Sequence, residues 1–366
     1  MLEVAGRRLK EPLVLSPMVD VTDAAFRSIA TEWGADVTCS EMVAATGLVH
    51  DNAAAWAHLQ PWPGESPYGV QFMCGNPEEM GQAVRHMATR VKPDFVDVNL
   101  GCPAPNILRS CAGGFLMKDP RQAGRVIRAA KEAADEAGIP HVSAKMRLGP
   151  DSRHLTYLEV AEEARAAGAS WVTLHARTVE QGYAGEADWS HIARLVEAVQ
   201  LPVIGNGDLW SAEAVVRMRD ETHCAGFFIA RAAMRDPTIF RRMRAALDGS
   251  APEGTGPGGA AGLSPAPAAG PSMAERLETL QEYLRRAQAV GITRLPDLQR
   301  QATRFVAGGP GARRLRAAFA QARSLEALRG LVAAAQATAT LAPGSLEVAA
   351  LHDQAAEGEE HDRVRE

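Results

Sequence analysis

The first 245 residues alternate short apolar segments with longer segments of amphipathic helical composition. Eight segments are short, apolar and rich in β-branched residues, which predicts strands at 13–18, 36–43, 68–73, 95–101, 141–148, 171–177, 202–208 and 226–231. The segments between them have helix composition, and several begin with Thr, Asn-Pro, Ser or Asp, which cap helices: 23–33, 77–91, 121–137, 156–167, 190–199 and 211–218. Eight strands alternating with helices predict an α/β fold, a closed parallel TIM (β/α)8 barrel.

A doubly wound open sheet is the competing fold. Such a sheet normally has a glycine-rich turn after its first strand, where a dinucleotide phosphate binds. Here that turn has the sequence Ser16-Pro17-Met18-Val19-Asp20, without glycine. The barrel is therefore favoured, and its active site is expected at the carboxyl ends of the strands.

A change of composition follows the barrel pattern. Residues 249–271 are almost all Gly, Ala, Pro and Ser, which is typical of a flexible linker. Beyond it, helical spacing of Leu, Ala and Arg predicts a small all-α bundle at 274–289, 296–306, 312–321 and 325–335. The expected organisation is a catalytic barrel over 1–246, a linker over 247–271, an Arg-rich helical domain over 272–338 and an acidic, disordered tail over 339–366.

Charge is segregated along the chain. The whole chain has a formal net charge of −5, but the segment 272–340 has eleven Arg, no Lys and five acidic residues, a net charge of +6. The first 271 residues have a net charge of −6, and residues 341–366 one of −5. Because the planar guanidinium group fits phosphate, this basic segment indicates a polyanionic partner, although a solvated helical face is an equally open interpretation.

Composition excludes several classes of protein. With 366 residues and 46% hydrophobic residues, the chain has enough apolar material for a large core. No apolar segment approaches the length of a membrane span, and residues 1–10 lack a hydrophobic signal core, so a cytoplasmic location without membrane attachment is expected. The five cysteines are scattered, with no C-x-x-C pair, which predicts reduced thiols and no metal site.

Polar residues end most of the predicted strands. In a strand with a two-residue period, Asp97 and Asn99 lie on one side, as do Lys145 and Arg147, and His175 and Arg177. A single such residue is usually solvated, but their recurrence over five strands predicts a barrel mouth that receives an anionic, hydrogen-bonding ligand. The last two strands end at 205–208 and 230–233, where barrels of this kind usually bind phosphate, so a phosphorylated cofactor is favoured.

Cys102 lies on a Gly-Cys-Pro turn at this mouth. An ordinary thiol has a pKa of about 8.5 and is mostly protonated at neutral pH, so it could donate a proton. His175 or Lys145 could instead convert it to a nucleophilic thiolate, and the spacing does not decide between these roles. Cys39, Cys74 and Cys224 fit small core residues, and the role of Cys111 stays open.

Seven segments, taken together, resemble the tRNA-dihydrouridine synthase family of the bacterial type. They are SPMVDVTDAAFR at 16–27, VQFMCGNPE at 70–78, DVNLGCPAP at 97–105, KMRLG at 145–149, LHARTVEQGYAGEADW at 174–189, NGD at 206–208 and IARAAMRDPTIF at 229–240. The resemblance covers about residues 10–245 and continues weakly over 300–316, which is similar to the helical RNA-binding tail of the family. It implies an FMN enzyme that reduces the C5=C6 bond of uridine in RNA, most often tRNA, with NADPH as the reductant.

The resemblance also implies roles for individual residues. Cys102 matches the catalytic cysteine, which gives a proton to C5 after hydride from reduced flavin reaches C6. Residues expected at the flavin are Pro17, Met18, Val19, Gln71, Lys145, His175, Asn206, Gly207, Asp208, Ala230 and Arg231. Residues expected at the RNA substrate are Asn99, Arg177, Arg304, Arg313, Arg314 and Arg316.

The sequence departs from the family pattern in places, and alternatives stay open. Family members commonly have Gly-Arg-Gly-Ala where this chain has Ala230-Arg231-Ala232-Ala233, and the linker is longer than expected. The alternatives are a synthase acting on ribosomal RNA, an FMN barrel acting on a free pyrimidine or another small molecule, and an RNA-binding protein without catalysis. A monomer is expected.

Overall fold

The computed structural model describes residues 1–250, 270–308 and 311–341. Most of the expected linker and nearly all of the expected acidic tail lie outside these residues. The described residues form two compact units, the first comprising Met1–Ala230 and Phe240–Ser250, and the second comprising Arg231–Ile239 and the described residues from 270 onward. The domain boundaries expected from composition stay predictions.

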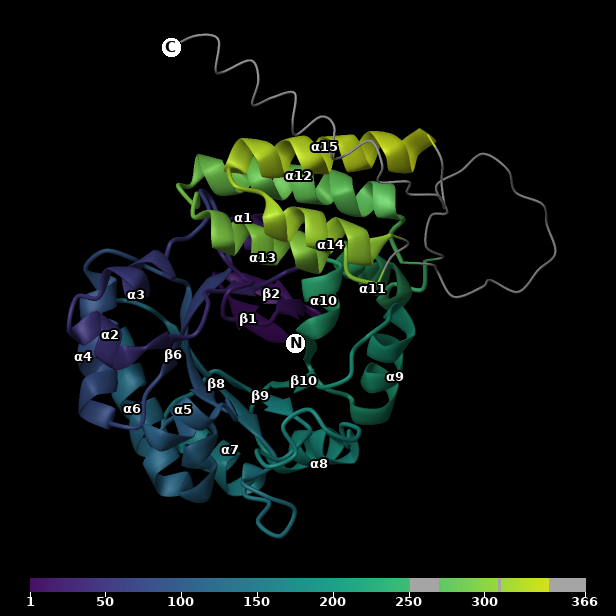
Figure 1. The fold of residues 1–366 in the computed structure, drawn as a ribbon. Helices are drawn as coiled ribbons and strands as arrows, with labels where there is room; N and C mark the ends of the chain where they lie inside the picture. The colour runs from purple at the N-terminus through teal and green to yellow at the C-terminus, as the bar shows by residue number, and fades with distance from the viewer. Residues whose placement is uncertain (251–269, 309–310, 342–366) are drawn as a thin grey trace, which may run out of the picture. The chain divides into compact units, whose positions relative to one another are not determined.

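A parallel barrel with surrounding helices makes up the first unit (Figure 1). Its strands are β3 (Leu13–Leu15), β4 (Thr38–Cys39), β5 (Val43–Ala44), β6 (Tyr68–Met73), β7 (Phe95–Leu100), β8 (His141–Arg147), β9 (Trp171–His175), β10 (Val203–Asn206) and β11 (Gly226–Ile229). They pair in the order β3-β11-β10-β9-β8-β7-β6-β4, and a parallel bridge between Val14 and Val37 joins the two ends. The predicted TIM barrel is confirmed.

Helices follow the strands as the capping residues predict. They are α1 (Ala24–Glu32), α2 (Ala45–Val49), α3 (Ala53–Ala57), α4 (Pro77–Ala88), α5 (Pro105–Arg109), the 3-10 helix η1 (Gly113–Lys118), α6 (Pro120–Glu136), α7 (Tyr157–Ala166), α8 (Ser190–Ala198), α9 (Ala212–Thr222) and α11 (Ile239–Leu247). The Asp23 carboxylate accepts a hydrogen bond from the Phe26 N–H at the start of α1, and Asn76 caps α4 in the same way. The short helices α2, α3, α5 and η1, and the helix α11, lie where no helix is predicted.

The predicted strand over 36–43 is the main local error. It is two short strands, β4 and β5, because residues 40–42 leave the ladder between them. Glu41, within this break, is 5% exposed and binds the imidazole of His58 at 2.6 Å. Its carboxylate also accepts the backbone N–H of Asp20. A buried carboxylate that is satisfied by these two partners therefore occupies the break in the strand.

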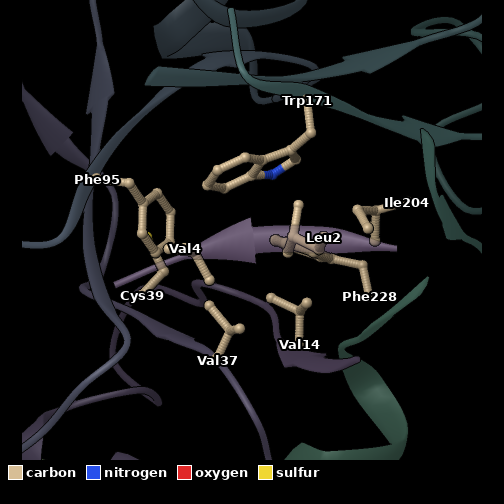
Figure 2. Packing of buried hydrophobic residues seen from close by; sticks show 9 residues of the cluster. All are labelled: Leu2, Val4, Val14, Val37, Cys39, Phe95, Trp171, Ile204 and Phe228. Atoms are coloured by element: carbon tan, nitrogen blue, oxygen red, sulfur yellow. The ribbon is translucent and has the colours of Figure 1, made fainter. Parts of the chain in front are cut away.

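A hairpin that the sequence analysis does not predict packs against the barrel interior. It pairs β1 (Leu2–Val4) with β2 (Arg7–Leu9) through a turn in which Ala5 and Gly6 both have positive φ. Figure 2 shows its two inward side chains, Leu2 and Val4, among buried residues of the barrel. Those partners are Val14, Val37, Cys39, Phe95, Trp171, Ile204 and Phe228. Phe95 and Trp171 are the first residues of β7 and β9, and Val37 directly precedes β4, so the hairpin packs near the amino ends of the strands, opposite the mouth.

Helices form the second unit. They are α10 (Arg231–Arg235), α12 (Met273–Ala289), α13 (Leu295–Phe305), α14 (Ala312–Gln321) and α15 (Leu325–Leu341), and the last four confirm the predicted helical bundle. Ser272 and Glu275 form a capping box that starts α12. Tyr283 of α12 and Phe305 of α13 pack with ring centres 5.6 Å apart. Within the described ranges, no helix is both long and apolar enough to cross a membrane.

The packing of the hairpin leads to a stability prediction. Leu2 is 1% exposed, so Leu2→Ala should lower the free energy of unfolding by about 3 kcal/mol, because it leaves a cavity at the base of the barrel. Urea unfolding followed by circular dichroism measures this loss. Glu3→Ala, on the exposed face of the same strand, is the matched control and should change stability by less than about 0.5 kcal/mol. Equal stability of Leu2→Ala and wild type would contradict the packing.

Candidate active site

The turn that follows β7 holds Cys102 in a fixed position. The side-chain oxygen of Asn99 accepts the backbone N–H groups of Gly101 at 3.1 Å and Cys102 at 2.9 Å. The Cys102 carbonyl accepts the N–H of Gly114 at 3.0 Å. The buried guanidinium of Arg147 donates to the carbonyl of Gly101 at 2.8 Å. The thiol is therefore carried by a backbone held from three sides.

Glycine is required where η1 meets this turn. Gly113 has φ +58°, and a Cβ there would lie 2.8 Å from Ile107 Cγ2 and 3.2 Å from Cys102 Cβ. At Gly114 a Cβ would lie 3.0 Å from the Cys102 carbonyl oxygen. The loop thus packs directly on the cysteine. A larger residue at Gly113 or Gly114 would displace either the loop or the cysteine.

Buried polar side chains from neighbouring strands extend from the same turn into the barrel. Asn99 Nδ2 donates to Gln71 Oε1 at 2.9 Å, and Gln71 Nε2 donates to Asp97 Oδ2 at 2.6 Å. Ser143 Oγ donates to Asp97 Oδ1 at 2.5 Å. Burial raises the pKa of Asp97, while the hydrogen bonds from Gln71 and Ser143 oppose that rise. The structure therefore brings the predicted residues Gln71 and Asn99 together.

Lys145 lies beside this group, opposite Asn99 on β7 and Thr173 on β9 in the strand register. Its ammonium group forms no hydrogen bond or ion pair with any residue that the structure describes, and its Nζ lies 5.5 Å from the ring centre of Phe228. Burial, reinforced by the positive charge of Arg147, lowers the pKa of Lys145 from 10.5 to about 8. The negative charge of the Asp97 carboxylate opposes this shift. A cation held in this state favours an anionic ligand.

Thr173 provides a second unsatisfied group. Its hydroxyl is the one buried side-chain oxygen or nitrogen, within the described chain, that lacks a hydrogen-bond partner. Trp171, two residues earlier on β9, faces the barrel core, and His175, two residues later, is also buried. Because side chains alternate along a strand, Thr173 faces the same interior, beneath the mouth.

Arg177 and Asp208 bind each other. The guanidinium of Arg177, 2% exposed, donates to both carboxylate oxygens of Asp208 at 3.0 and 2.7 Å. Arg177 also donates to the carbonyls of Ala184 and Gly185, and Asp208 accepts the N–H of Ala187 at 2.9 Å. This pair fixes the loop over 178–187. The expected contacts of Arg177 with substrate and of Asp208 with flavin stay predictions.

The ends of β9 and β10 meet at a glycine. Gly207 has φ +122°, and a Cβ there would lie 2.6 Å from Ala187 Cβ and 3.1 Å from His175 Cδ2. Asn206 donates to the Phe228 carbonyl at 2.7 Å, which ties β10 to β11. His175 and Asn206 are therefore both buried, and both lie next to the backbone of Gly207, which carries no side chain.

The remaining predicted flavin residues lie on two other loops. Pro17, Met18 and Val19 follow β3, where the N–H groups of Val21 and Thr22 bond to the Met18 carbonyl and Val19 is 49% exposed. Ala230 follows β11 directly, whereas Arg231 begins α10 in the second unit. Contact of these residues with flavin stays a prediction.

Comparison with known proteins agrees with this architecture. The sequence profile described as "Dihydrouridine synthase (Dus)" matches residues 14–327, which include all of the barrel strands but the first residue of β3 and reach the start of α15. The chain belongs to the dihydrouridine synthase family. The predicted family resemblance is thereby confirmed.

Individual proteins of the family are also similar to this chain. The chain is 37% identical over 239 residues to a protein of Aquifex aeolicus, with 65% of this chain and 74% of the relative covered. It is 38% identical over 245 residues to one of Treponema pallidum, with 65% and 72% covered. A protein of Mycobacterium leprae is 31% identical over 345 residues, with 86% and 85% covered. All three have the name "Probable tRNA-dihydrouridine synthase".

The family match includes the arginine-rich helices. Arg313, Arg314 and Arg316 on α14 are exposed and form no hydrogen bond or ion pair with the described residues. Arg304 on α13 is partly buried and bonds to Gln301 at 3.5 Å. The buried side chains of α14 are Leu315 and Phe319. Leu315 lies between Arg314 and Arg316 in the sequence, and Phe319 comes three residues after Arg316. The basic residues therefore form the solvated face of an amphipathic helix.

Sequence analysis misses some of the residues that hold the mouth together, and it misses the restraining role of others. Glu41 and His58 restrain the loop after β3, and Asp97, Ser143 and Arg147 restrain the Cys102 turn. For Glu41 a signal is present, since a charged residue inside an apolar strand segment needs a buried partner. Asp97 and Arg147 are predicted at the mouth, but spacing does not reveal their bonds to Ser143 and to the Gly101 carbonyl across the neighbouring strands β7 and β8.

The buried ammonium group leads to a pH prediction for the flavin-free protein. The folded-state pKa of Lys145 is lowered, so the unfolded chain binds more protons between pH 8 and 10.5, and stability should rise with pH in that window. Lys145→Met removes this contribution, so the stability difference between variant and wild type should shrink as pH rises from 8 to 10.5. Urea unfolding at several pH values measures this difference.

The control for this experiment is Lys92→Met, at an exposed position of the same unit. Its stability difference from wild type should not change with pH. A difference for Lys145→Met that is equally flat would contradict the buried state of the ammonium group.

Proposed function

We propose that the protein reduces the C5=C6 bond of uridine to 5,6-dihydrouridine in tRNA, with FMN as its cofactor and NADPH as its reductant. The Cys102 turn supports this proposal most directly, because it places a restrained thiol at the carboxyl end of a barrel strand in a chain of the dihydrouridine synthase family. Tight restraint of the backbone is what a group that transfers a proton to one carbon atom requires.

Three observations support the fit of an anionic flavin to the mouth. Within the described residues, the ammonium of Lys145 has no hydrogen-bond or ion-pair partner, and the buried hydroxyl of Thr173 has no hydrogen-bond partner. Gly207 offers backbone that lacks the Cβ which would meet His175 and Ala187. An isoalloxazine ring with a phosphate tail carries the negative charge and the hydrogen-bonding edge that these groups would satisfy.

The residues proposed to hold FMN are those expected from the sequence. In the first unit they are Pro17, Met18, Val19, Gln71, Lys145, His175, Asn206, Gly207, Asp208 and Ala230. Gln71 has one Nε2 hydrogen beyond the bond to Asp97, so it can still donate to a ring oxygen. A role for Arg231 is part of the same proposal.

Reduction of uracil adds a hydride at C6 and a proton at C5. Bound FMN would supply the hydride to C6, with NADPH restoring its reduced form. Cys102 would supply the proton from the neutral thiol to C5, so that the sulfur takes the electron pair of the S–H bond and is reprotonated from solvent. Asn99, three residues before the cysteine, would donate to the uracil edge with the Nδ2 hydrogen that Gln71 does not use.

A uridine inside folded RNA must leave its stack to reach such a mouth. Binding to the phosphates around it would supply energy for this step. Arg304, Arg313, Arg314 and Arg316 are proposed for that role, because the three on α14 are exposed cations without a partner in the described structure. A cytoplasmic location and a monomeric state are proposed with this function.

Removal of the thiol tests the catalytic role. Cys102→Ala should retain bound FMN but lower the rate of dihydrouridine formation by ~10²–10⁴-fold, because no other group replaces the proton donor. Nucleoside mass spectrometry of unmodified tRNA incubated with enzyme and NADPH measures the product, and visible absorbance measures the flavin.

Cys111→Ala is the matched control, since Cys111 is exposed and lies on the same connection after β7. It should keep nearly full activity. If Cys102→Ala makes product at the wild-type rate, Cys102 is not the proton donor; if wild-type protein reduces free uridine as well as tRNA, the small-molecule alternative gains support.

Charge reversal on α14 tests the RNA contact. Arg313→Glu combined with Arg316→Glu should weaken tRNA binding by roughly tenfold or more at low salt and reduce the steepness of its salt dependence, because fewer counterions are released. Fluorescence anisotropy of labelled tRNA across a salt series measures both effects.

Arg285→Ala serves as the control, because Arg285 is exposed but already paired with Glu282 at 2.6 Å. Its affinity for tRNA should stay within about twofold of wild type, since exposed pairs contribute little. Unchanged affinity of the double variant would show that α14 does not contact RNA.

A further inference from the structure

One chain of hydrogen bonds connects the interior of the barrel with the Cys102 turn. It runs from Ser143 through Asp97, Gln71 and Asn99 to the backbone N–H groups of Gly101 and Cys102. All four side chains are less than 9% exposed. Water therefore cannot easily replace a lost partner, and each bond constrains the next.

The direction of this chain is fixed at both ends. At one end the N–H groups of Gly101 and Cys102 can only donate, so the Asn99 oxygen must face them and its amide nitrogen must face Gln71. Gln71 then presents its oxygen to Asn99 and its nitrogen to Asp97. At the other end Asp97 must accept, and an ionised carboxylate accepts with both oxygens.

We propose that Asp97 is a positioning residue that acts through Gln71 and Asn99 to orient the turn carrying Cys102. Its carboxylate sets the orientation of the Gln71 amide, which sets that of the Asn99 amide, which in turn holds the two N–H groups of the turn. Asp97 does not itself contact the reacting atoms. The consequence for catalysis rests on the proposed function, whereas the orientation of the amides does not.

A pair of substitutions that reverses the donor and acceptor roles along this chain of hydrogen bonds provides a test. A simple loss of contacts cannot produce the same result. Asn99→Asp keeps an acceptor for the turn but places a second carboxylate in the chain of hydrogen bonds. Gln71 then lies between two carboxylates, so its side-chain oxygen must face one of them, and neither can donate. Asp97→Asn in the same molecule removes this conflict. The amide that this substitution introduces can turn its nitrogen to the Gln71 oxygen and its own oxygen to the Ser143 hydroxyl, so every donor again meets an acceptor.

The measurement is hydrogen exchange of the Gly101 and Cys102 amides in the full chain at a fixed neutral pH, resolved by mass spectrometry. Asp97→Asn alone should exchange within about threefold of wild type, because the introduced amide can give its oxygen to Gln71 and its nitrogen to the Ser143 hydroxyl. Asn99→Asp alone should exchange roughly tenfold faster or more, because the conflict between the two carboxylates breaks the chain. The double variant should return to within about threefold of wild type, since its chain is again complete.

The outcomes separate the proposal from its rivals. A double variant that exchanges as fast as Asn99→Asp, or faster, would overturn the proposal, because independent losses add and do not rescue each other. Wild-type exchange in Asn99→Asp would overturn it too. If Asn99→Asp does not fold, recovery of a folded double variant, judged by circular dichroism, supports the proposal, and failure to recover opposes it.

Two further measurements complete the design. Ser143→Ala removes a bond to Asp97 without changing the orientation of Gln71, so exchange at Gly101 and Cys102 should stay near wild type. Exchange needs neither flavin nor RNA. A failed rescue would therefore count against the positioning role alone, whereas Cys102→Ala that still makes dihydrouridine would count against the proposed function alone.

Discussion

Closure of the sheet is the constraint on which the rest of the first unit depends. The bridge between Val14 and Val37 completes the ring, so every second side chain faces an interior that opens only at its two ends. Near one end that interior is filled by apolar residues and by the N-terminal hairpin. Near the other end polar and charged residues occupy the same inward positions, and they must bind one another or a ligand.

Most of these polar groups bind one another. The groups that do not are the ones that determine which ligand the mouth can bind. Gln71, Asp97, Asn99 and Ser143 satisfy each other, and Arg147 and Arg177 hold backbone carbonyls of the surrounding loops. Within the described structure, Lys145 and Thr173 lack such partners. A rigid frame around a few unsatisfied groups is a preorganised site, because a ligand that satisfies them does not have to rearrange the frame.

The sequence predicts this architecture well where the signals are local. The strand segments and the helix caps follow from periodicity and from residues such as Asp23 and Asn76, and a two-residue period predicts that Asn99 and Lys145 reach one mouth, where the strand register places them opposite each other. It fails where partners are remote. The pairing of Arg177 with Asp208 depends on the fold of the loop over 178–187, and the break at Glu41 depends on His58. Alternation at Leu2, Val4 and Leu9 around Ala5-Gly6 is the signal by which the hairpin could have been predicted.

The position of the hairpin has a consequence for how the chain is made. Leu2 and Val4 precede Ile204 and Phe228, which help to enclose them, by about 200 residues or more along the chain. At a translation rate of ~5–20 residues per second, the apolar N-terminus waits on the order of 10–45 s for its binding surface. During biosynthesis the hairpin is thus an apolar nascent segment whose binding surface is complete only when the last barrel strand emerges.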